Sequence, residues 1–170
     1  MIVPPNKPEP LPVPEDIGTA RQLWWGVAGL GVVYTGASVV TMYGQRGDLG
    51  EQLLEQTHKT DPNITAATVD ALILVAFGVT ALIGLVLCGV TALLAHQLGR
   101  GKSWARAVLT VVAVWLVLGA VATMFNIAAV SGAAALVSGA TAIVQGVLAA
   151  GAAYLSFRPD STRYFQLNKR

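Results

Sequence analysis

Charged side chains are scarce in this sequence. They make up 12% of its 170 residues, against about 25% in an ordinary soluble domain. The longest stretch without one covers residues 107–157, and two more uncharged stretches cover 22–45 and 71–99. A bilayer core about 30 Å thick takes about 20 helical residues to cross. The longest stretch can hold two crossings, so the chain is predicted to cross a membrane four times.

Reactive and metal-binding motifs are missing as well. Cys88 is the sole cysteine and lies in an apolar run, so no intrachain disulfide can form. The sequence contains no nucleophile elbow, zinc-protease motif or phosphate-binding loop. His58 stands near several acids, but their spacing matches no standard metal site. From these missing motifs we expect no enzyme activity, cofactor or metal. The net charge of only +2 is too small to indicate a nucleic-acid partner.

The predicted fold is an all-α integral membrane four-helix bundle. The expected spans are 24–43, 71–95, 104–125 and 133–157, within a transmembrane domain at 21–157. Six prolines fall within residues 1–20, which we expect to form a disordered tail. That tail could instead dock to a partner. Residues 158–170 form a second tail with basic and aromatic side chains.

The loop between the first two spans, residues 46–70, is acidic. Its leucines recur at near-helical spacing, which predicts a short amphipathic helix at 48–57. Asp61 precedes Pro62, and this pair is typical of a helix start, so Asp61 is expected to cap the second span. The expected contact residues of this larger outer loop are Asp48, Glu51, Glu55 and Asp61.

Basic residues predict the orientation of the chain. The two tails and the 96–106 turn hold nine of them: Lys7, Arg21, Arg100, Lys102, Arg106, Arg158, Arg163, Lys169 and Arg170. The opposite side holds only Arg46 and Lys59. This bias predicts a plasma-membrane protein with both termini in the cytoplasm. Arg100, Lys102, Arg106, Arg158 and Arg163 are expected to anchor the inner leaflet. The C-terminal tail should lie along that leaflet with its aromatic rings in the interface, or else dock to a protein.

Small residues at every fourth position predict helix-packing or partner-binding faces. The second span carries Thr80, Gly84, Cys88 and Ala92, and the fourth carries Ser138, Ala142, Gly146 and Ala150. Gln145 lies near the middle of the fourth span, where its amide needs a partner. A hydrogen bond between helices is favoured over a polar lining for a conduit.

Two segments resemble those of known proteins. The turn Gly-Arg-Gly-Lys-Ser-Trp-Ala-Arg at 99–106 and the tail Phe-Arg-Pro-Asp-Ser-Thr-Arg-Tyr-Phe at 157–165 resemble segments of small four-span membrane proteins of actinobacteria. One kind of such protein is an accessory subunit of the mycobacterial Mce lipid-import transporter. The resemblance implies a similar role and supplies no catalytic residues. The loop layout is also similar to that of claudins, but their paired loop cysteines are missing here.

Two functions remain open at this point. The first is a non-catalytic accessory or regulatory subunit that binds a larger integral membrane complex, with membrane lipids around it. The alternative is a small oligomeric transporter or lipid-binding protein that acts on its own. It would use Gln145, Asn126 and Asp70 along a polar seam. The alternative requires that seam to be continuous, which the positions of these side chains can decide.

Overall fold

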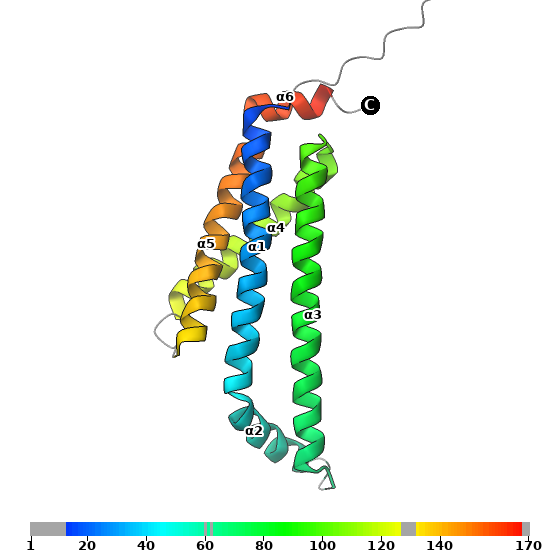
Figure 1. Cartoon of the computed structure of the whole chain (residues 1–170), viewed down its shortest axis with the longest axis vertical. Helices are drawn as coiled ribbons and strands as arrows, with labels where there is room; N and C mark the ends of the chain where they lie inside the picture. The colour runs from blue at the N-terminus through cyan, green and yellow to red at the C-terminus, as the bar shows by residue number, and fades with distance from the viewer. Residues whose placement is uncertain (1–12, 60, 62, 127–131, 168–170) are drawn as a thin grey trace, which may run out of the picture.

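The described part of the chain is entirely helical. The computed structural model describes residues 13–59, 61, 63–126 and 132–167, and it contains six helices and no strand within them (Figure 1). The helices are α1 (Glu15–Gly44), α2 (Arg46–His58), α3 (Ala66–Gly99), α4 (Ser103–Asn126), α5 (Ala133–Ser156) and α6 (Pro159–Leu167). Helices α1, α3, α4 and α5 are long and apolar enough to cross a membrane. For the described residues, the prediction of an all-helical fold with four helices long and apolar enough to span a membrane is confirmed.

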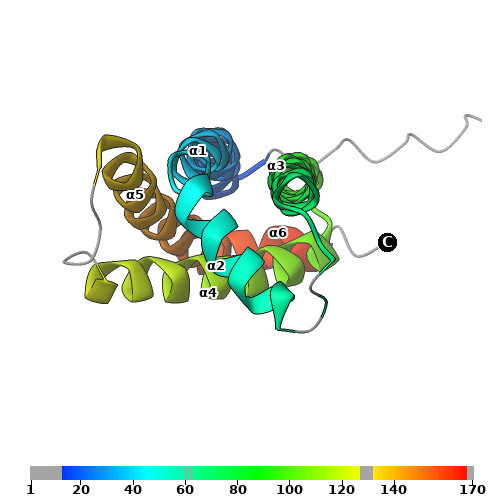
Figure 2. The ribbon, with the colours of Figure 1, turned by 90° about the horizontal axis from the view of Figure 1, so that it is seen from below.

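The four long helices form an open bundle. Helix α1 lies between α3 and α5 and packs extensively on both, and α4 packs mainly on α5. Contact between α3 and α4 is much smaller. Figure 2 shows the reason, because α4 runs across the bundle while α1 and α3 are seen almost end-on. Helix α3 is therefore covered mainly on the side that faces α1.

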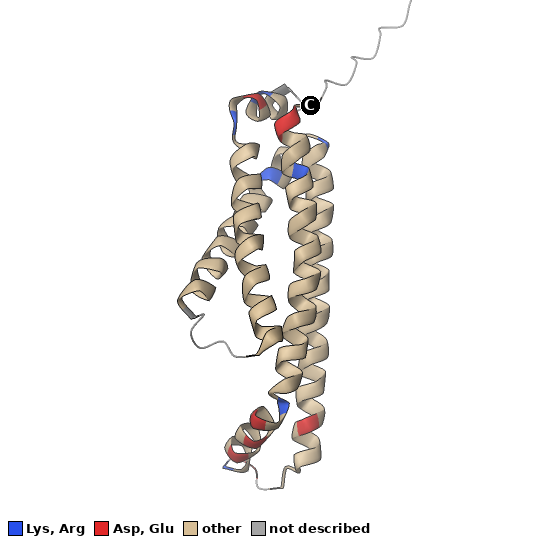
Figure 3. Cartoon of the chain, turned by 60° about the vertical axis from the view of Figure 1, so that its left-hand side comes forward, with Lys and Arg blue, Asp and Glu red and all other residues tan. Residues whose placement is uncertain are grey.

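The main hydrophobic core lies at one end of the bundle. It joins the start of α1, the end of α3, the start of α4, the end of α5 and α6. Trp24, Ile17, Leu98 and Leu109 are its largest side chains that are almost completely buried. Most described lysines and arginines lie at or near this end, which we call the basic end (Figure 3). The opposite end, which holds α2, is the acidic end.

A second, smaller cluster lies at the acidic end. Val69, Ile73 and Phe77 of α3 are its buried members, and Leu49 and Leu54 of α2 pack against them. One side of α2 thus packs Leu49 and Leu54 against α3. The acidic side chains of α2 remain exposed. This helix includes the 48–57 segment for which the leucine spacing predicted helix.

Two helix starts differ from the prediction. Helix α1 begins at Glu15, inside the predicted tail, because Glu15 and Asp16 favour a helix N-terminus and Ile17 is completely buried. Residues 1–12 of that tail lie outside the described part. Asp61 does not cap α3, which begins at Ala66. Its cap is Thr65, whose hydroxyl accepts a hydrogen bond from the Thr68 N–H at 3.3 Å.

The C-terminal tail differs most. It forms α6, which folds across the basic end instead of placing its aromatic rings in the membrane interface (Figure 1). Tyr164 and Phe165 belong to the main core and are only 7% and 3% exposed. The Ser161 hydroxyl donates a hydrogen bond to the Leu155 carbonyl at 2.9 Å. Residues 168–170 lie outside the described part.

Candidate functional site

Three helices meet around Gly31 in the middle of the bundle. The Gln145 Nε2 of α5 donates a hydrogen bond of 2.9 Å to the Val27 carbonyl of α1, and the bond is buried. A Cβ added at Gly31 would lie 2.6 Å from Cys88 Sγ of α3 and 3.2 Å from Gln145 Nε2. The absence of a side chain at Gly31 is thus what lets α3 and α5 approach α1 here. The Gln145 amide holds two helices together and does not line an open conduit.

The small residues of α3 contact α1 in the middle of their row. A Cβ added at Gly84 would lie 2.7 Å from Thr35 Oγ1, so Gly84 faces α1 as Cys88 does. Ala92 is half-buried. Thr80 is exposed, and its hydroxyl donates to the Ala76 carbonyl of its own helix at 2.8 Å. The expected face therefore packs inside the chain at Gly84 and Cys88 but not at Thr80.

The small residues of α5 face two different neighbours. A Cβ added at Gly146 would lie 2.6 Å from Ala120 Cβ and 3.2 Å from the Leu116 carbonyl oxygen, so this glycine contacts α4. Ser138 and Ala142 are half-buried, and Ala150 is exposed. The side chains that α5 buries are those of Thr141, Gln145, Ala149, Ala152 and Ser156, together with Gly146. The predicted row shares only Gly146 with this set, because α5 packs on both α1 and α4.

The acidic residues of α2 are free for contacts outside the chain. Asp48, Glu51 and Glu55 are all exposed, and only Glu55 pairs with a cation, Lys59, at 3.4 Å. Exposed pairs of this kind contribute little. Asp61, just beyond α2, is also exposed and accepts a hydrogen bond from a nearby backbone N–H. No cluster of three metal-binding side chains occurs among the described residues.

The basic residues divide into exposed and engaged groups. Arg100, Lys102 and Arg163 are exposed. Arg158 pairs with Asp16 at 2.9 Å and so ties the end of α5 to the start of α1. Arg106 is half-buried and is engaged by aromatic rings instead of an acid.

Arg106 lines a crevice between the start of α4 and helix α6. Its guanidinium carbon lies 3.9 Å from the centre of the Phe157 ring and 5.5 Å from that of Phe165. Its Nη1 donates to the Thr162 hydroxyl at 3.4 Å. The crevice has a volume of about 260 Å³ and is also lined by Ser103, Ala107 and Gln166.

Comparison of the chain with protein-family models, with curated proteins and with solved structures finds no match.

Several features of the site were not predicted. Val27 was missed because its role depends on which helices adjoin α1, and span composition does not specify neighbours. The ring contacts of Arg106 were missed because α6 was not expected to fold back. Pro159 at its first position and Asp160 in its first turn were available as start signals.

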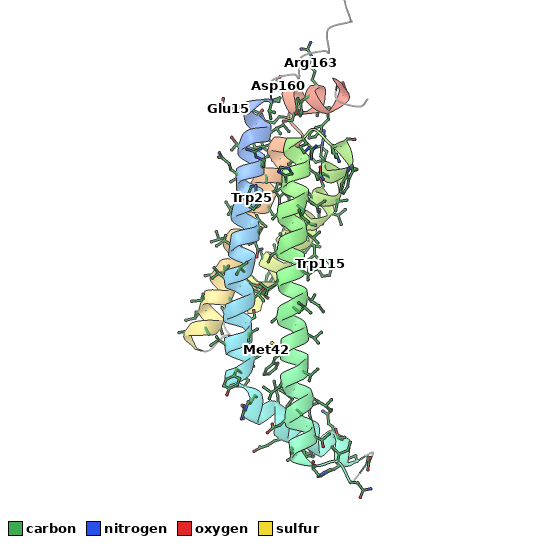
Figure 4. The ribbon with its side chains drawn as sticks, turned by 45° about the vertical axis from the view of Figure 1, so that its right-hand side comes forward. Glu15, Trp25, Met42, Trp115, Asp160 and Arg163 are labelled. Atoms are coloured by element: carbon green, nitrogen blue, oxygen red, sulfur yellow. The ribbon has the colours of Figure 1, made fainter. Side chains whose placement is uncertain are left out.

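Apolar side chains cover most of the outside of the bundle. Trp25 and Trp115 project outward from α1 and α4 (Figure 4) and are 52% and 77% exposed. Many aliphatic side chains of α3 and α4 are exposed in the same way. Such surface suits lipid or neighbouring helices, and it has no equivalent on a soluble domain of this size.

Proposed function

We propose that this chain is a non-catalytic accessory subunit of a larger membrane complex, of the kind that moves lipid. In this proposal it resides in the cell membrane with both termini in the cytoplasm and α2 outside. It binds its partner through the outer half of α3 and places the acids of α2 on the partner's outer part. The observation that carries the proposal is the mismatch in length between α3 and the helices α4 and α5.

Helix α3 is much longer than a membrane crossing requires. Its 34 residues extend about 51 Å at about 1.5 Å per residue, whereas the hydrocarbon core is about 30 Å thick. Helices α4 and α5 have 24 residues each. At the acidic end, α1 and α3 therefore extend beyond α4 and α5 (Figure 1). In that extension, Leu72 and Val75 are both 62% exposed and Leu74 is 49% exposed.

Lipid alone fits this shape poorly. If the bilayer is centred on α4 and α5, the exposed aliphatic side chains of α3 extend past the hydrocarbon. If it covers the whole apolar part of α3, the facing ends of α4 and α5 lie inside the hydrocarbon, where unpaired backbone groups are costly. The intervening residues 127–131 carry no charge. A partner beside the outer half of α3 resolves the mismatch in either placement.

Outward-facing glycines offer places for that partner to approach. Gly78 lies in the outer half of α3 and Gly89 nearer the basic end. They are eleven positions apart, which puts them within about 20° on a helix of 3.6 residues per turn. Both are exposed, and a Cβ added to either would meet nothing within 4 Å. Gly29 and Gly36 of α1 are open in the same way. Glycines on a helix surface permit close helix–helix contact in membranes, and these four are unused within the chain.

The association with lipid transport rests on the resemblance of residues 99–106 and 157–165 to small actinobacterial four-span proteins, among them an Mce accessory subunit. The alternative, a transporter acting alone, has less support. Gln145 is bonded to α1 in the middle of the bundle, whereas Asp70 lies beside Gly50 of α2 at the acidic end. The side chain of Asn126 lies outside the described part. Gln145 and Asp70 therefore do not lie together along one polar seam, which a transporter acting alone would need.

Photo-crosslinking from α3 in native membranes tests the proposal. A photoreactive residue at Val75, in the extension, should give a crosslink to one defined membrane protein. The matched control is Val111 of α4, which is 70% exposed and lies near the basic end, and it should give mainly lipid adducts. Crosslinks to lipid alone from both positions, together with recovery of the chain as a lone species after mild extraction, would refute the proposal.

The orientation is tested separately by labelling with a membrane-impermeant maleimide. In a Cys88→Ala background, Glu51→Cys should be labelled on intact cells. Arg163→Cys should be labelled only after the cells are opened. The reverse pattern would place α2 in the cytoplasm and contradict the orientation.

A further inference from the structure

Within the described part of the chain, Arg106 has no carboxylate partner. Among the described residues, Arg158 and Lys59 are the two cations in ion pairs. Arg106 nonetheless lies half-buried next to two phenylalanine rings, where an uncompensated charge is costly. Its surroundings add positive potential, because Arg100 and Lys102 in the preceding turn are exposed and without ion pairs in the described structure. The crevice therefore favours an anion.

The aromatic contacts also fix how that anion would bind. The Phe157 ring, 3.9 Å from the guanidinium carbon, restrains the Arg106 head group through a cation–π contact. A guanidinium has five N–H donors, and one of them bonds Thr162. The others remain for an acceptor in the plane of the group. A planar fork of this kind matches the paired oxygens of a phosphate.

The rest of the crevice supplies further donors. Ser103 and Thr162 contribute hydroxyl groups and Gln166 an amide, all lining the same space of about 260 Å³. Ser103 is also the first residue of α4, where backbone N–H groups lack partners within the helix. A phosphate in this position would meet donors from α4 and α6 at once.

The depth of the crevice matches that of a lipid headgroup. Arg106 lies in the first turn of α4, close to Phe157 at the end of α5, so it is at the boundary of two membrane-spanning helices. Trp104, two positions before it in the chain, is 52% exposed, as expected for a tryptophan at the membrane interface. We infer that the crevice between α4 and α6 binds a phosphate group through Arg106, with Ser103, Thr162 and Gln166 as additional donors. The inference does not depend on membership of a complex.

Native mass spectrometry of the purified full chain in detergent tests this site. Phosphatidylglycerol and phosphatidylcholine are titrated in parallel, and inorganic phosphate is added as a soluble competitor. We expect one saturable phosphatidylglycerol site in the unaltered chain. The substitution Arg106→Gln should weaken it by about tenfold or more, the usual scale for losing a hydrogen bond to a charged group. Arg106→Lys, which keeps the charge but lacks the fork, should bind with intermediate affinity.

Arg163→Gln is the matched control. It makes the same change in charge at the same end, but Arg163 is exposed on α6 and projects away from the bundle (Figure 4). It should alter the affinity by less than about twofold, because exposed charges act weakly. Should Arg106→Gln fail to fold, as judged by its circular dichroism, Gln166→Ala removes one donor and should weaken binding severalfold.

The competitor distinguishes the source of the phosphate. If inorganic phosphate displaces phosphatidylglycerol, and its own binding depends on Arg106, the site takes soluble phosphates. If phosphatidylglycerol alone binds in an Arg106-dependent way, the site takes an anionic lipid. Equal binding of every probe to the Arg106→Gln and Arg163→Gln variants would overturn the inference.

Discussion

The contact between α4 and α5 at Gly146 allows a sharp test of how closely the helices pack. A methyl group added by Gly146→Ala would lie 2.6 Å from Ala120 Cβ and 3.2 Å from the Leu116 carbonyl oxygen. Neither atom can rotate away, because one is a Cβ and the other belongs to the backbone. The two helices must therefore separate, and their remaining contacts must loosen.

The expected loss follows from two opposing effects. Overpacking of a tight contact costs about 1–3 kcal/mol, while replacing a glycine inside a helix gains up to about 1 kcal/mol. The control Gly151→Ala lies on the same helix, and its added methyl group would lie 3.8 Å from Leu23 Cδ1, an ordinary contact. Because both variants share the helix-propensity gain, Gly146→Ala should be less stable than Gly151→Ala by about 1–3 kcal/mol.

The free energy of unfolding is measured by titrating the protein from mild detergent micelles into sodium dodecyl sulfate, with helicity as the signal. Ala120→Gly removes the nearest atom, so combining it with Gly146→Ala should restore stability beyond additivity, by about 1 kcal/mol. Equal stability of Gly146→Ala and Gly151→Ala, or strict additivity in the double variant, would show that α4 and α5 are not in close contact at this position.

Three further substitutions are expected to separate the strong interactions from the weak ones. Gln145→Leu, which loses the hydrogen bond to α1 but keeps its volume, should lower the unfolding free energy by about 0.6–2 kcal/mol in the same titration; no change would mean that the bond is absent in solution. Phe165→Ala should cost about 3–5 kcal/mol and speed tryptic cleavage after Arg163, and an unchanged cleavage rate would argue against a docked α6. Arg158→Gln breaks the pair with Asp16, but Arg158 is half-exposed, so it should cost less than about 1 kcal/mol and less still in high salt; a larger loss would contradict the assignment.

The membrane spans were predictable because their signal is strong and local. An uncharged stretch long enough to cross the bilayer strongly indicates a membrane-spanning helix. All four predicted spans fall on helices long and apolar enough to cross. The helix starts were less predictable. The helix predicted at 48–57 from leucine spacing lies within α2. Asp61 and Pro62 were a plausible helix start, but α3 begins at Ala66 and is capped by Thr65.

The packing faces were harder to predict, because they depend on neighbours. Gly146 lies against α4 while Gln145, one position away, bonds α1. One row of small residues cannot describe a helix with two partners. Likewise, Arg158-Pro159-Asp160 was interpreted only as the end of a span, since proline cannot continue a helix. The same residues favour the start of α6, and the apolar side of that helix became evident only against the core that it covers.

The main core joins the first and last described helices of the chain. Trp24 of α1 and Phe165 of α6 belong to the same cluster, although they lie far apart in the sequence. A nascent chain can insert all four spans and still leave Trp24 without the residues that complete its surroundings. The main core therefore closes only after α6 has been made, and a product truncated before Pro159 should be recognised by membrane quality-control proteases in spite of its complete set of spans.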